Sequence, residues 1–156
     1  MATKLMETAL GAVNTYLQAQ MAAKLNTLDA EYADGITLAD IVTWYIAPQM
    51  AIPEYPAVLL LSDNSVITGE GQAWIRAQHQ VTIVVIVADQ DTTTLQKRLW
   101  RYTRAIIELL KAARESVGWA YTVSFNSVEF TPFFATDGQY LSDARVIIQL
   151  GSTEAT

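Results

Sequence analysis

The sequence predicts an α+β domain, in which a largely antiparallel or mixed sheet of four to five strands packs against a long helix and an N-terminal helix. Its 156 residues suit a single domain, and 51% are hydrophobic against 17% charged, far from the composition of disordered chains. The patterns run helix, two or three strands, long helix, two strands, an order typical of α+β folds. We therefore expect one domain over residues 1–150 and a short tail over residues 151–156.

The first helix is expected over residues 3–28, where apolar residues recur at spacings of three to five. Asp34-Gly35 marks the break after it, because glycine readily adopts the left-handed backbone that ends helices. Residues 36–56 keep neither a helical nor a strand period, and their prolines each remove a backbone donor. This segment is predicted to be a partly extended connection.

A short strand is expected over residues 58–62, followed by a turn over residues 63–65, because Asp and Asn tolerate left-handed backbone. Residues 66–68 are expected to pair back on that strand. A flexible loop then follows, formed by Gly69, Glu70 and Gly71.

The strongest strand covers residues 74–88 and carries apolar residues at alternate positions, with both faces apolar in its second half. A strand of about fifteen residues is longer than usual. We expect it either to bend, or to project beyond the domain with its first half, which contains Trp74 and Arg76, and to contact something else there.

Capping residues over 89–94 precede the long helix, whose apolar stripe runs from Leu95 to Val117 and stops at Gly118. Two strands, over residues 121–131 and 139–150, complete the domain. Asp137-Gly138 between them is typical of a hairpin turn.

Candidate catalytic residues are few. The chain has no cysteine, which excludes thiolate nucleophiles and Cys-type zinc sites. His79 is its only histidine, and a structural role is expected for it. Asp89 and Asp91 form a pair that a hard cation would accept, although helix capping explains them better. We predict no catalytic, metal or cofactor site. The alternative is a small metal-dependent hydrolase or ligand-binding domain that uses these three residues.

Charge is distributed unevenly. The net charge of −6 opposes nonspecific nucleic-acid binding, yet six of the ten bases lie within residues 97–114. Helical spacing places Lys97, Arg101 and Arg104 in a row, with Arg98 and Lys111 to either side of it. This cluster of bases is either a solvated face or a contact with an acidic partner, another subunit or passing nucleic acid. An adjacent tryptophan favours an interface. The candidate interface residues are Arg98, Trp100, Arg101, Arg104, Trp74, Arg76, Gly69, Glu70 and Gly71.

Four segments resemble the tail terminator (tail-completion) proteins of long-tailed bacteriophages: residues 55–61, 74–88, 99–106 and 138–148. The resemblance extends from the first helix to about Leu150. It implies a hexameric ring that sits on the last ring of tail-tube protein, stops tube growth and presents a docking face to the capsid connector. DNA would pass through the channel without sequence recognition. Arg98, Arg101 and Arg104 would then meet an acidic partner surface or line that channel.

The resemblance implies a virion protein of the tail or neck, made in the host cytoplasm. Neither a signal peptide nor a membrane-spanning stretch is expected, so no membrane partner is predicted. A head-closure connector, a tail-tube subunit and a plain cytoplasmic regulatory oligomer remain open as alternatives, because charge segregation suits each of them.

Overall fold

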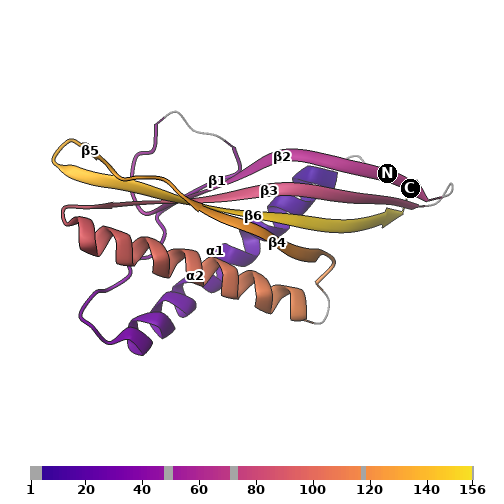
Figure 1. The fold of residues 1–156 in the computed structure, drawn as a ribbon. Coiled ribbons are helices and arrows are strands. Elements are labelled where there is room, and N and C mark those ends of the chain that lie inside the picture. The colour runs from indigo at the N-terminus through magenta and orange to yellow at the C-terminus, as the bar shows by residue number, and fades with distance from the viewer. Residues whose placement is uncertain (1–4, 48–50, 71–73, 117–118, 156) are drawn as a thin grey trace.

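Two helices pack on one face of a twisted mixed sheet, which confirms the predicted α+β class (Figure 1). The computed structural model describes residues 5–47, 51–70, 74–116 and 119–155. Within these ranges the sheet has six strands, instead of four to five, because two short strands join it. The elements in chain order are α1 (Leu5–Tyr32), β1 (Thr43–Tyr45), β2 (Ala57–Glu70), β3 (Trp74–Asp89), α2 (Thr92–Glu115), β4 (Thr122–Phe130), β5 (Phe134–Thr136) and β6 (Gln139–Ala155).

The strand order is β1-β2-β3-β6-β4, with β5 paired to the start of β6. β1 lies parallel to β2, and the other pairs are antiparallel. The last strand of the chain therefore lies inside the sheet. It pairs with β3 over the whole length of that strand, from Trp74↔Ala155 to Asp89↔Tyr140.

The core lies between the helices and the inward-facing row of β3. The apolar stripe of α1 is buried there from Leu10, that of α2 from Leu95 to Ala113, and the row of the long strand from Ala77 to Val87. Val117 and Gly118, the predicted end of the second stripe, lie outside the described residues. This core contains Leu10, Val13, Leu17, Met21 and Leu25 of α1, Val81, Ile83, Val85 and Val87 of β3, and Leu95, Leu99, Tyr102, Ile106 and Leu109 of α2.

The turn predicted at residues 63–65 is wrong. β2 runs unbroken from Ala57 to Glu70, and its pairing with β3 shifts between Ser62↔Val81 and Asn64↔Gln80. Asp63 occupies this bulge, where its Oδ2 accepts a hydrogen bond of 2.5 Å from the Thr82 hydroxyl. A residue type that favours turns thus supplies the extra residue of a β-bulge.

The loop predicted for residues 69–71 is also wrong where the structure describes it, because Gly69 and Glu70 still pair with β3. Gly71 lies outside the described residues. The tail expected over residues 151–156 is wrong too: β6 continues to Ala155, opposite the first residues of β3. An unpaired stretch of β3 offers backbone donors and acceptors, which the end of the chain satisfies.

Two local predictions are confirmed. Asp137 and Gly138 have φ angles of +47° and +78°, as the hairpin turn between β5 and β6 requires. The break after α1 lies where expected, since Ala33 and Gly35 have φ angles of +47° and +82°. The following connection contains the short strand β1. No helix in the described ranges is long and apolar enough to cross a membrane.

Candidate assembly surfaces

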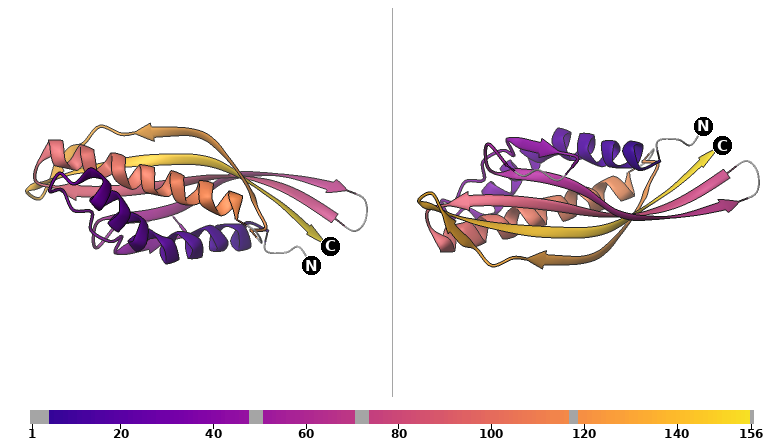
Figure 2. Two further views of the ribbon diagram at one scale, coloured as in Figure 1. Left: turned by 90° about the horizontal axis from the view of Figure 1, so that it is seen from below. Right: turned by 90° about the horizontal axis from the view of Figure 1, so that it is seen from above.

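The sheet continues beyond the helices at one end, as Figure 2 shows from both sides. We call the part of the sheet from the Asp63 bulge towards this end the arm; it comprises residues 62–70 of β2, 74–80 of β3 and 150–155 of β6, which pair with one another. A bend and a projecting first half were the two alternatives expected for the long strand; its first half pairs with two strands of its own chain. The arm therefore presents a stiff three-stranded surface and not a loose loop.

The arm exposes apolar side chains on the outer strand β2. Val66 and Ile67 are 63% and 57% exposed. In the described part of the chain, β1 pairs only with Ala57, Val58 and Leu59, so the rest of β2 has one edge without a strand partner. Exposed apolar residues on an open strand edge mark a site where another chain adds.

His79 lies at the base of the arm and is 1% exposed. Its Nδ1 lies 2.8 Å from the Ser65 hydroxyl on the neighbouring strand. The predicted structural role fits this position, because the pair joins β3 to β2 where the arm leaves the core.

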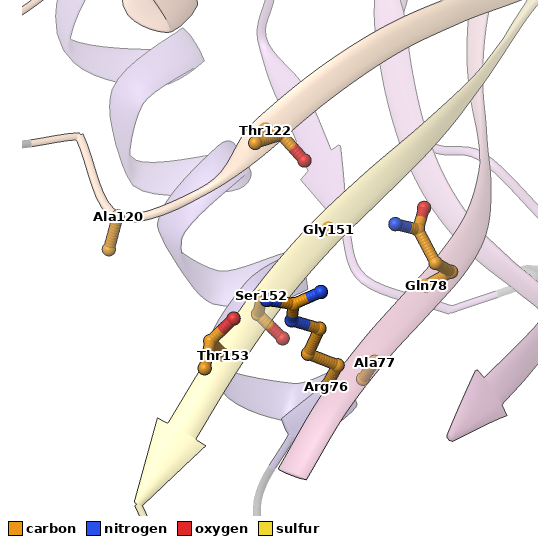
Figure 3. Close-up of a pocket in the computed structure, with 8 residues that line it drawn as sticks. All are labelled: Arg76, Ala77, Gln78, Ala120, Thr122, Gly151, Ser152 and Thr153. Carbon is orange, nitrogen blue, oxygen red and sulfur yellow. The ribbon is translucent and has the colours of Figure 1, made fainter. Parts of the chain in front are cut away.

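The face of the arm opposite the His79 side chain is hollowed above Gly151 (Figure 3). The hollow has a volume of about 380 Å³, and Arg76, Gln78, Thr122 and Thr153 surround it. A Cβ on Gly151 would lie 2.3 Å from Thr122 Oγ1 and 3.1 Å from Gln78 Nε2. Glycine therefore lets the side chains of the two flanking strands close over β6. Hydrogen-bonding side chains and the cationic Arg76 line this hollow.

Arg101 does not lie on a solvated row. It is 5% exposed and donates two hydrogen bonds to Asp34, of 3.0 Å to Oδ1 and 2.5 Å to Oδ2. Its guanidinium also lies 3.9 Å from the centroid of the Tyr32 ring. These hydrogen bonds lower the pKa of Asp34 to about 2. Arg101 therefore fixes the turn after α1 to α2.

The other two predicted arginines are paired within the chain as well. Arg98 binds Asp89, and Arg104 binds Glu31 and Glu108. The hydrogen bond to Glu31 is the main cause of the raised pKa of Arg104. All three predicted arginines thus form ion pairs with carboxylates of their own chain.

Trp100, in contrast, is 54% exposed, as an interface residue should be. It borders an apolar groove of about 400 Å³ between α2 and β4, together with Ile107, Val128 and Phe130. β4 is the outermost strand on this side, paired with β6 alone among the described strands. We call this surface the aromatic groove.

The remaining interface candidates give less information. Trp74 and Glu70 have backbones in β3 and β2, but their side chains lie outside the described residues, as does Gly71. Sequence reasoning missed Val66, Ile67 and Phe130. An apolar pair inside the otherwise polar stretch of residues 62–70 was the signal for the first two.

The three residues of the hydrolase alternative do not converge. His79 lies in the arm, and Asp89 lies at the other end of β3, about 33 Å away at the rise of an extended strand. Asp91 caps α2: its Oδ2 accepts hydrogen bonds of 2.8 Å from the Thr94 N–H and hydroxyl, and the N–H bond is the main cause of its lowered pKa. Within the described ranges, no three acidic or histidine side chains are grouped so that they could hold a metal ion.

Neither a protein-family model nor a curated protein matches this chain.

Proposed function

We propose that this protein is a structural subunit without catalytic activity, whose copies join head to tail in a closed ring that caps the end of a phage tail tube. The observation that carries this proposal is the arm: a rigid extension with exposed Val66 and Ile67 on an open strand edge. Keeping such a surface in water is unfavourable unless a partner covers it.

Two different surfaces support the ring. The open edge of β2 in the arm and the aromatic groove beside β4 belong to opposite edges of the sheet, with β3 and β6 between them. A subunit that joins its neighbour through two unlike surfaces forms a head-to-tail contact, and such contacts close into rings when the rotation between copies fits.

The place of the ring, on the last ring of tail-tube protein and facing the capsid connector, rests on the resemblance of residues 55–61, 74–88, 99–106 and 138–148 to tail terminators. The net charge of −6 opposes nonspecific retention of DNA, which suits a subunit past which DNA must move. The protein would then reside in the virion, at the tail end or neck.

Electron microscopy of negatively stained tail tubes, with and without the purified protein, tests the proposal. We expect a discrete ring at one end of each tube, and tubes of uncontrolled length when the protein is omitted during assembly. Incorporation along the whole tube would identify a tube subunit instead. Absence of rings, free or on tubes, would refute the proposed function.

A further inference from the structure

We infer that the open edge of β2 in the arm of one copy adds to β4 of the next copy and inserts Ile67 into the aromatic groove. The inference rests on the proposed ring and names the contact that closes it. The occupant of the groove is thus a second copy of this chain.

Two open strand edges support this contact. Beyond Leu59, β2 has an unpartnered edge in the described part of the chain, and the outer edge of β4 is likewise open over its 9 residues. Each edge presents a row of N–H and C=O groups that a strand from another chain satisfies. One edge of each type per subunit gives a contact that repeats from copy to copy.

The side chains that would meet lie on the same face of the sheet. Ile67 pairs with Ala77, which faces the helix side of the sheet, so Ile67 faces that side too. In β4, Val128 and Phe130 pair with Val146 and Ala144 of the core row and share the same face. A strand added to β4 in a continuous sheet therefore points Ile67 towards α2 and into the groove.

The groove and the arm also fit each other in shape. The groove is bordered by large side chains, those of Trp100 and Phe130. On the arm, the residues that share the face of Ile67 on either side are small: Ser65 and Gly69. One apolar side chain between two small ones fits a hollow with a bulky rim, and about 400 Å³ accommodates it together with part of the strand.

A copy cannot fill its own groove, because β3 and β6 separate the two edges and the arm extends away from the helices (Figure 2). The contact is therefore between copies. It is a head-to-tail contact, in which each subunit inserts its arm into one neighbour and receives the arm of the other.

Cysteine cross-linking tests this contact directly, because the chain contains no cysteine of its own. The double variant Ile67→Cys/Trp100→Cys, treated with a short bis-maleimide, should give a ladder of oligomers up to the closed ring. A mixture of Ile67→Cys protein with Trp100→Cys protein should give dimers and nothing larger, since each cross-link uses one arm and one groove. Both side chains are more than half exposed, so the variants should keep the thermal stability of the wild type.

The matched control is Val42→Cys/Trp100→Cys, since Val42 is 52% exposed and lies outside the arm. It should give no cross-linked oligomers under the same treatment. Rings on tail tubes that yield no ladder from Ile67→Cys/Trp100→Cys would overturn the inferred contact and leave the proposed function standing. A cross-link from Trp100→Cys to tail-tube protein, in place of a second copy, would also overturn it. A ladder without any capping of tubes would support the contact and refute the proposed function.

Discussion

Replacing Arg101 by methionine should lower the free energy of unfolding by about 2–3 kcal/mol. Methionine keeps the apolar stem that packs in the helix interface and removes the guanidinium, which is 5% exposed. The loss comprises two hydrogen bonds to the Asp34 carboxylate and the contact with the Tyr32 ring. Since about a third of the Asp34 side chain is exposed, water compensates part of the loss, and the figure lies below that for a fully buried pair.

Urea denaturation at pH 7 measures this difference, and the melting temperature should fall by about 5–10 °C. Lys97→Met is the matched control, because Lys97 is exposed on the same helix, one turn earlier; a change within about 0.5 kcal/mol is expected there. Equal stabilities of the two variants would refute the assignment of Arg101 as a clamp between α1 and α2. Arg101 would then be available to a partner, as the row of bases suggested.

The pH dependence gives an independent check of the same pair. Asp34 has a folded pKa of about 2, below its ordinary value of 3.8, so its contribution is complete above about pH 4 and disappears as the pH falls through 2. The gap in stability between wild type and Arg101→Met should be constant between pH 5 and 7, and should narrow between about pH 4 and 2. A gap that does not change down to pH 2 would show that Asp34 is not the partner that matters.

Three further substitutions test the fold around the surfaces. Gly138→Ala should cost about 1–2 kcal/mol, because φ is +78° at this position, and urea titration would show no loss if the turn were of another type. Gly151→Val should lower the melting temperature, since its Cβ would lie 2.3 Å from Thr122 Oγ1; adding Thr122→Ala should restore part of the loss, and purely additive effects would contradict the contact. Tyr102→Phe should cost about 1–2 kcal/mol in chemical denaturation, because the buried hydroxyl donates a hydrogen bond of 2.5 Å to the Ala39 carbonyl; a neutral substitution would mean that water replaces it.

The basic row illustrates how far local spacing leads. Helical periodicity placed Lys97, Arg101 and Arg104 on neighbouring turns, which is correct for α2. It gave no information on Asp34, which precedes Arg101 by 67 residues and neutralises it. Exposed Trp100 kept its predicted character, because the residues that border the groove leave its ring accessible.

The arm shows the same division. The length of residues 74–88 predicted either a bend or a first half that projects beyond the domain, and the structure shows the strand continuing beyond the helices. Its partners were predicted wrongly. Asp63 was expected to reverse the chain, and residues 151–156 to trail from it, yet both segments continue along β3 as strands.

The sequence by itself determined the two amphipathic helices, the long strand, the hairpin turn at Asp137-Gly138 and hence the α+β class. Each of these depends on periodicity or backbone preference within a few residues. Only the tertiary structure decided that Asp63 forms a bulge, that β6 lies between β3 and β4, and that Arg101 is neutralised by Asp34. The physical reason is that strand pairing and charge pairing join groups far apart along the chain, where no local pattern records the partner.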